Sequence, residues 1–264
     1  MDKLITACVT NNYENAKIYI KYLKDELKFN FDKPFIKACE HGSLKIAKLF
    51  IKNEDISMET IEKAFIEAIT NNHIDIVKYL FEKNKIPITE KMLLQANSNF
   101  EMLSFLLKNG GNINLCDEDI LVNPCENNNL EIVELILEYG FKNRNGLSLA
   151  IASKEDNLDI VELLIDNGFD IFYDDGVVLN NIIWSCNDDT ILVEKLLKMG
   201  IKANSDDNKF MRRACEKRYI NVIKLLVKYG AKINKTDLEK LEKEKQDYEN
   251  KVAQLTKIIN LVKN

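Results

Sequence analysis

A chain of 264 residues is long enough for one large domain, two ordinary domains or an array of repeats. Its hydrophobic fraction of 46% beside 30% charged residues excludes intrinsic disorder, and its 3 prolines and 9 glycines argue against a loop-rich or all-β fold. With a net charge of −5, the chain lacks the excess of basic residues that neutralises phosphates, so we expect no nucleic-acid partner.

The N-terminal segment and the hydropathy of the chain bear on its location. Residues 1–12 lack the order of charged, apolar and small residues that marks a secretory signal. No stretch approaches the roughly 18 consecutive apolar residues that span a bilayer. We therefore expect a cytoplasmic protein with no membrane partner.

Helix-ending glycines recur along the chain at spacings of 30, 28, 32 and 30 residues: Gly110, Gly140, Gly168, Gly200 and Gly230. Each follows an apolar run whose spacing gives a helix one buried face. A glycine just past such a run takes the left-handed conformation without strain and stops the helix. Two earlier runs end at Glu54 and Asn84 in place of glycine.

A shorter apolar stretch precedes each of these helices and centres on a small residue: Ala7, Ala38, Ala68, Ala96, Ala150 and Ala214. In four units this alanine precedes the first apolar residue of the second helix by six residues. The interval is two residues shorter in the fourth unit and two residues longer in the sixth. In the fifth and seventh units the position falls on Pro124 and Ile182. We expect both to distort their first helices, Pro124 by removing a mid-helix hydrogen bond.

The pattern divides the chain into helix–turn–helix units. In chain order we expect a degenerate N-terminal capping repeat at 1–31, repeats at 32–60, 61–88, 89–116, 117–144, 145–174, 175–206 and 207–235, and a C-terminal helix at 236–264. The fold class predicted is an all-α solenoid of about eight repeats with short finger loops and a C-terminal capping helix.

The C-terminal helix allows two interpretations. Thr236 is the expected N-cap, and Glu239 completes a capping box. From Leu238 to Val262 apolar residues alternate by three and four, which suits either a cap folded back on the eighth repeat or a coiled coil with another chain. We favour the cap and a monomer, because a coiled-coil seam would contain a lysine and a tyrosine. A parallel pair would also bring two glutamates face to face.

The second unit resembles an ankyrin repeat in register, with these residues on the marked positions of that family: Pro34, Ala38, Gly42, Leu44, Ile46 and Leu49. Residues 71–80 and 229–234 resemble further pieces of the repeat, and the resemblance runs to about Lys235. The Asn-, Lys- and Ile-rich style is similar to ankyrin families of giant amoeba-infecting viruses and of some protists. A viral source would place the protein in the host cytoplasm.

The resemblance implies an ankyrin-type solenoid whose fingers and inner helices present a concave surface to a protein partner. One family feature is missing, because the histidine that ties neighbouring repeats is replaced in the first helices by Ile36, Ile66, Val122, Ser148, Asn180 or Arg212. The sequence therefore leaves open how neighbouring repeats are tied.

Cysteines and histidines invite a metal or redox hypothesis. Four cysteines directly follow the small-residue position of four repeats, which indicates core thiols in a reduced compartment: Cys8, Cys39, Cys125 and Cys215. His41 and His73 lie in turns, without a clustered third ligand. No phosphate loop, nucleophile elbow or HExxH motif occurs. We therefore expect no metal, no cofactor and no catalytic residues.

Charged and aromatic residues near the C-terminus suggest the contact surface. Three of the chain's four arginines cluster in the last repeat, and aromatic residues stand between acidic finger segments, which are typical anchors of binding surfaces. The expected partner-binding residues are Phe172, Tyr173, Trp184, Arg212, Arg213 and Arg218. Acidic second helices, with Asp159, Glu162 and Asp166 in repeat six, offer an alternative patch for a basic partner.

Three functions of different classes are consistent with these features. The favoured one is a non-catalytic scaffold that binds a protein of unknown identity. The second is a substrate adaptor that recruits host proteins to a ubiquitin ligase, although no F-box-like segment is visible and the tail is short and charged. The third is an enzyme, for which the sequence offers no clustered polar constellation.

Overall fold

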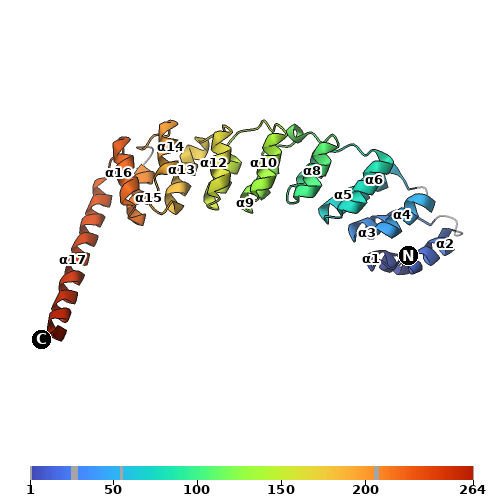
Figure 1. Ribbon diagram of the computed structural model, residues 1–264, viewed down its shortest axis with the longest axis horizontal. Helices are drawn as coiled ribbons and strands as arrows, with labels where there is room; N and C mark the ends of the chain where they lie inside the picture. Colours follow the sequence, from blue (N-terminus) through green and yellow to red (C-terminus); the bar gives the residue numbers. More distant parts are fainter. Residues whose placement is uncertain (1, 25–28, 54–55, 205–207, 264) are drawn as a thin grey trace. The chain divides into compact units, whose positions relative to one another are not determined.

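The computed structural model of the chain describes residues 2–24, 29–53, 56–204 and 208–263. Within these residues the chain forms seventeen α-helices and one short 3-10 helix, and no strand. The helices belong to two compact units, Met1–Asn143 and Arg144–Asn264. Each unit is a stack of helix pairs joined by short turns (Figure 1).

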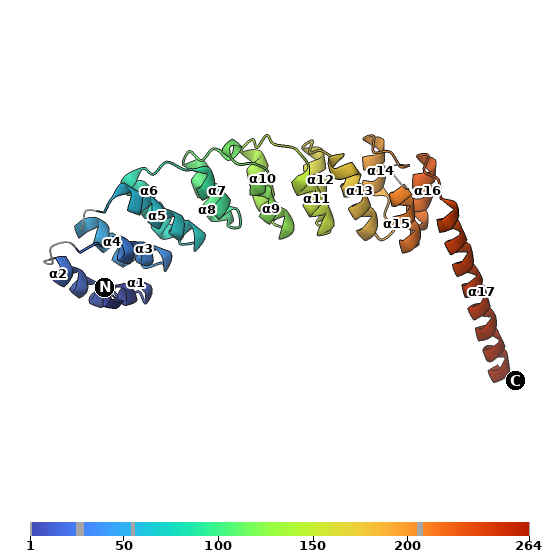
Figure 2. The ribbon, with the colours of Figure 1, turned by 180° about the vertical axis from the view of Figure 1, so that it is seen from behind.

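The first unit contains five helix pairs. In chain order they are α1 (Asp2–Val9) with α2 (Tyr13–Lys24), α3 (Asp32–Glu40) with α4 (Leu44–Asn53), α5 (Met58–Thr70) with α6 (Ile74–Asn84), α7 (Glu90–Ala96) with α8 (Phe100–Lys108), and α9 (Asp119–Glu126) with α10 (Leu130–Glu138). The 3-10 helix Ile113–Leu115 precedes α9. Each first helix packs on the next first helix, which gives the stack one continuous inner layer (Figure 2).

The second unit contains three pairs and a long terminal helix: α11 (Leu147–Lys154) with α12 (Leu158–Asp166), α13 (Tyr173–Ser185) with α14 (Ile191–Lys198), α15 (Lys209–Lys217) with α16 (Ile220–Lys228), and α17 (Lys235–Lys263). Here too the first helices α11, α13 and α15 pack side by side. The expected helix–turn–helix solenoid of about eight repeats is confirmed.

The glycine stops behave as the sequence predicts. All five have a left-handed φ, between 76° and 109°. Helix α6 of the third repeat extends through Asn84, one residue further than the sequence predicts. Lys85 therefore takes the left-handed conformation (φ 51°) at the end of this helix. Glu54 lies outside the described residues.

The small-residue position is buried, but its register in the sixth repeat differs from the prediction. In five repeats the predicted alanine is buried, and the amide of Ser43 donates to the carbonyl of Ala38 at 2.8 Å. In the sixth repeat Asn157 donates to Ala152 in the same way, at 3.0 Å, and Ala152 is buried whereas Ala150 is half-exposed. The interval there is the usual six residues, so the expected lengthening by two is wrong.

Helix α9 continues through Pro124 as one helix, whereas the sequence predicts a distortion there. Pro124 does remove the mid-helix hydrogen bond as expected, and the carbonyl of Ile120 that is left without its helical donor accepts from the side-chain amide of Asn97 at 3.3 Å. In α13 the backbone departs from helical geometry at 174–176 rather than at Ile182.

Residues in the turns supply ties between repeats. The Ser43 hydroxyl, which is buried, donates to the carbonyl of Cys8 in the preceding repeat at 2.6 Å. At the corresponding turn position of the next repeat, His73 Nε2 lies 2.9 Å from the carbonyl oxygen of Glu40. In these two repeats the residue before the second helix therefore makes a link to the preceding repeat.

The C-terminal helix is capped by a residue other than the predicted one. Asn234 Oδ1 accepts from the amide of Asp237 at 2.7 Å, and the Asn234 amide group donates to the Asp237 carboxylate at 2.7 Å. This reciprocal pair replaces the expected box of Thr236 and Glu239. Ion pairs with α15 hold the first turns of α17, but Tyr248, Val252 and Leu255 are exposed, so the expected cap is formed only by the start of the helix.

One predicted repeat boundary falls inside a helix. The boundary at 60/61 lies within α5, whereas that at 174/175 falls on the non-helical residues 174–176 near the start of α13. The boundary at 206/207 lies outside the described residues. Helix α17 begins at Lys235, one residue before its predicted start.

We predict that Ser43→Ala lowers the free energy of unfolding by about 1–3 kcal/mol, because the buried carbonyl of Cys8 loses its donor. Urea unfolding followed by circular dichroism measures this. Ser98→Ala, at an exposed turn position, serves as the control and should change stability by less than about 0.5 kcal/mol. Equal unfolding midpoints for the two variants would contradict the tie.

Candidate functional site

The side chain of Trp184 forms the centre of a cationic cluster in the second unit. Trp184 stands near the end of α13 with half of its surface exposed (51%). The guanidinium carbon of Arg213 lies 4.6 Å from its ring centroid, and Lys217 Nζ lies 3.4 Å from it. Both cations come from α15, the neighbouring first helix, so the cluster depends on the packing of two repeats.

The position of Arg213 is fixed from two sides. Its Nη1 lies 3.3 Å from Glu216 Oε2, one turn further along α15. Its guanidinium stacks on the indole, which is a favourable cation–π geometry. An aromatic ring in contact with two cations is a preorganised, half-exposed anchor of the kind that dominates protein interfaces.

The other two predicted arginines have contacts with the terminal helix. Arg212 Nε lies 3.7 Å from the carboxylate of Asp237. Arg218 pairs with Glu244 at 3.0 Å and lies over the ring of Tyr248. Both hold the start of α17 against the last repeat, which gives them a structural role that the sequence did not indicate.

Phe172 and Tyr173 lie away from the cluster, at the opposite end of α13. The ring of Phe172 is 55% exposed and approaches Gly200 after the next repeat's second helix. It lines a shallow hollow together with Lys202 and Lys209. The six predicted residues therefore separate into three groups, of which the structure brings Trp184 and Arg213 together and adds Lys217, which the sequence had not singled out.

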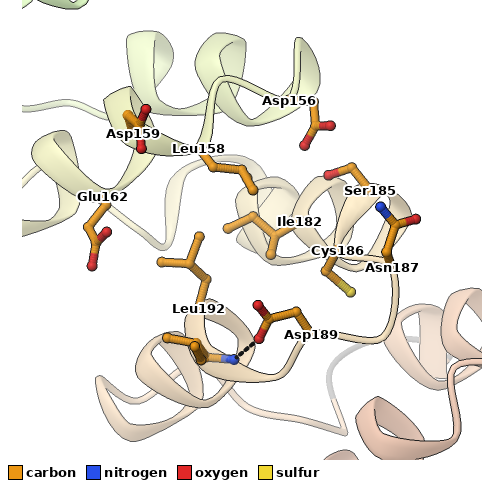
Figure 3. A pocket seen from close by; sticks show the side chains of 11 residues that line it. Asp156, Leu158, Asp159, Glu162, Ile182, Ser185, Cys186, Asn187, Asp189 and Leu192 are labelled. Carbon is orange, nitrogen blue, oxygen red and sulfur yellow. Dashed lines mark hydrogen bonds between the residues drawn. The ribbon is translucent and has the colours of Figure 1, made fainter.

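A groove of about 520 Å³ opens between repeats six and seven (Figure 3). Its apolar floor comes from Leu158 at the start of α12, Ile182 in α13, and Leu192 in α14. Its acidic rim includes Asp156 and Asp159. In the close-up the apolar side chains point toward one another across the groove and the carboxylates stand around them.

The groove exists because the seventh repeat has a longer turn. Five residues, 186–190, separate α13 from α14, whereas three separate α11 from α12. The Asp189 carboxylate in this turn accepts from the amide of Ile191, the first residue of α14, at 2.9 Å. Asp188 accepts from the amides of Asn221 and Val222, so it ties this turn to the next repeat.

The rim of the groove carries uncompensated negative charge. Glu162 is partly neutralised by Lys195 Nζ, 3.6 Å away, and Lys195 also pairs with Asp166. The carboxylates of Asp156 and Asp159 make no ion pair or side-chain hydrogen bond with the described part of the chain. Two carboxylates of the predicted acidic patch, Asp159 and Glu162, therefore border a hollow rather than a flat helix surface.

The cysteines lie in the core. All six are free and buried, and burial raises the pKa of Cys8 and of Cys125 to about 12. Within the described residues, no three His, Cys, Asp or Glu side chains are grouped so that they could hold a metal ion. The same part of the chain contains no helix with the length and apolarity to cross a bilayer.

The repeat architecture is matched by a family model. The model described as ankyrin repeats (3 copies) matches residues 4–92 and again residues 91–175, which is more than half of the sequence. The chain belongs to the ankyrin repeat family. Ankyrin repeats are generally modules for protein–protein interaction.

Two curated relatives are ankyrin repeat proteins of Acanthamoeba polyphaga mimivirus. One is 30% identical over 97 residues and the other 33% identical over 98 residues, which cover 36% and 37% of this ankyrin chain. The matches span only 21% and 15% of those viral proteins. Among solved structures, the human ASB11 ankyrin repeat domain aligns with a TM-score of 0.40 and 20% identity, over 76% of this chain and 86% of that domain.

Trp184 is the single tryptophan of the chain, so its fluorescence reports on the cluster directly. We predict that iodide quenches this emission more strongly than caesium does, because Arg213 and Lys217 concentrate anions at the ring. Lys217→Ala should lower the Stern–Volmer constant for iodide about twofold, whereas Lys202→Ala should leave it unchanged. Equal quenching by both ions would contradict the cluster.

We also predict that the folded chain reacts slowly with Ellman's reagent at pH 8. Burial keeps the thiols protonated, and the thiolate is the reactive form. In guanidinium chloride all 6 thiols should react within the mixing time of a manual assay. Rapid titration of even one thiol in the folded protein would contradict the burial of the cysteines.

Proposed function

We propose that this ankyrin chain is a non-catalytic scaffold that binds a protein partner through the first-helix surface centred on Trp184. The observation that carries the proposal is the half-exposed indole in contact with both Arg213 and Lys217. Tryptophan and arginine are the residues that most often dominate binding energies, and this pair is ordered before any partner arrives.

The charge of this surface indicates the chemistry of the partner. Arg213 keeps 30% of its side chain exposed, and the Lys217 ammonium lies over the indole. A partner segment that carries a carboxylate beside an apolar side chain would pair with the cations and cover the ring. Such complementarity accelerates association and selects against basic partners.

The groove of Figure 3 has the opposite charge, which separates the two surfaces experimentally. Removing Asp156 and Asp159 charges there should not affect a partner that binds at Trp184. The groove therefore supplies a matched control within the same unit.

We predict that Trp184→Ala and Arg213→Ala each weaken partner binding by at least about 10-fold, since truncating a central anchor costs about 2 kcal/mol or more. Affinity capture from the native cell with quantitative mass spectrometry identifies the partner. Titration of that purified partner against each variant then gives the dissociation constants.

The control variants are Phe172→Ala, another exposed aromatic, and the double variant Asp156→Asn with Asp159→Asn. Both should retain the dissociation constant of the parent chain. Unchanged capture by Trp184→Ala would refute the proposed surface. Capture of ubiquitin-ligase components along with a second protein would favour the adaptor function over a simple scaffold.

A further inference from the structure

The groove between repeats six and seven exposes a side chain that other repeats bury (Figure 3). In the second helices that end at a glycine, the residue eight positions before that glycine belongs to the core. It is between 0% and 4% exposed in four of these helices: Met102, Ile132, Ile160 and Val222. Leu192 holds this position in α14, but it lines the groove and is partly exposed. The groove therefore opens onto a core position.

The residue before Leu192 adds an apolar side chain at a position that is polar elsewhere. Ile191 lines the groove and is 71% exposed. Nine positions before the glycine, the other four helices carry polar residues: Glu101, Glu131, Asp159 and Asn221. Because the repeat accepts a polar residue at this position, the fold does not require isoleucine there. Ile191 and Leu192 thus give the groove an exposed apolar wall.

Negative charge surrounds this apolar wall. Among the described residues that line the groove, none is a lysine or an arginine, and four are acidic: Asp156, Asp159, Glu162 and Asp189. Glu162 has Lys195 as a partner, and Asp189 accepts from the amide of Ile191. The exposed side chains of Asp156 and Asp159 form no ion pair within the described part of the chain. Both are therefore open to a cation from another molecule.

The geometry of the turn does not account for the charge of Asp156. This residue lies two positions before α12 and has a left-handed φ of 60°. Asn72 and Asn128 hold the same place before α6 and α10, with φ of 60° and 55°. Asparagine therefore satisfies this backbone conformation without a charge. The carboxylate of Asp156 is a feature of the groove rather than a requirement of the turn.

We propose that this groove binds a segment of a partner protein in which a lysine or an arginine stands beside an apolar side chain. The apolar side chain covers Ile191 and Leu192, and the cation pairs with Asp156 or Asp159 at the rim. The apolar contact supplies binding free energy, and the charge pair steers the segment and selects it over others. The volume of about 520 Å³ lies within the range of about 300–1,000 Å³ that holds compact ligands, which suits one short segment.

The sign of the charge argues against other classes of macromolecule. Nucleic acids and anionic membranes present phosphates, which the acidic rim repels. The Trp184 surface has the opposite charge, although Ile182 of the groove and Trp184 come from the same helix. A basic segment is therefore attracted to the groove and repelled by Arg213 and Lys217. The groove is thus a second binding site, independent of the one proposed at Trp184.

A phage-displayed library of random dodecapeptides tests the chemistry of the occupant. The panning target is the full chain with Trp184→Ala, so that the other proposed surface is removed. We expect enrichment of peptides in which lysine or arginine stands next to leucine, isoleucine or phenylalanine. Failure to enrich such peptides, or enrichment of acidic peptides in their place, would overturn the proposal.

Fluorescence anisotropy with the most enriched peptide, labelled with fluorescein, locates its site on the parent chain. The double variant Asp156→Asn with Asp159→Asn should raise the dissociation constant by at least about 10-fold and remove most of its dependence on salt. Ile191→Asn should raise it by at least about fivefold, because an apolar contact is lost. Other repeats carry Asn72 and Asn221 at these positions, so both variants should fold, which circular dichroism checks.

Two matched control variants lie outside the groove. Glu131→Gln with Glu134→Gln removes two exposed charges from α10, the second helix of the preceding repeat. Ile220→Asn removes an exposed isoleucine at the start of α16. Both should keep the dissociation constant of the parent chain. Equal effects of the groove variants and the control variants would place the peptide elsewhere and overturn the proposal.

Discussion

The structure depends on the close approach of neighbouring first helices at a buried small residue. One helix pair of this length cannot bury both of its apolar faces, so each repeat is stabilised by the next. Ala38, Ala68 and Ala214 keep these helices close, and the turn residues Ser43 and His73 fasten neighbouring repeats through backbone carbonyls. Asn181 in the first helix α13 adds a tie of its own, because its side-chain amide donates to the carbonyl of Ala150 and to the hydroxyl of Ser153 in the preceding repeat.

The candidate surfaces arise where the seventh repeat differs from the regular unit. A longer turn between α13 and α14 opens the acidic groove, and Trp184 occupies an exposed first-helix position next to two cations of α15. About 200° of helix rotation separates Trp184 from Ile182 on the groove floor. One helix thus contributes to a basic aromatic surface and to an acidic apolar groove, and each suits a different partner chemistry.

Helix α17 is held at its start by residues of the last repeat. Arg212 and Arg218, which by sequence resemble interface anchors, anchor this helix within its own unit.

The sequence by itself determined the repeat, the five glycine helix stops and much of the core, because glycine stops and apolar spacing are local properties that recur in each unit. It also singled out Trp184 and Arg213 as candidate contact residues, but it could not show that they meet, since the two residues are 29 positions apart along the chain. Tertiary structure alone decided which of Ala150 and Ala152 is buried, how Asn97 compensates for Pro124, and which arginines hold α17. These outcomes depend on packing between repeats, where a neighbouring side chain supplies the partner that no local pattern specifies.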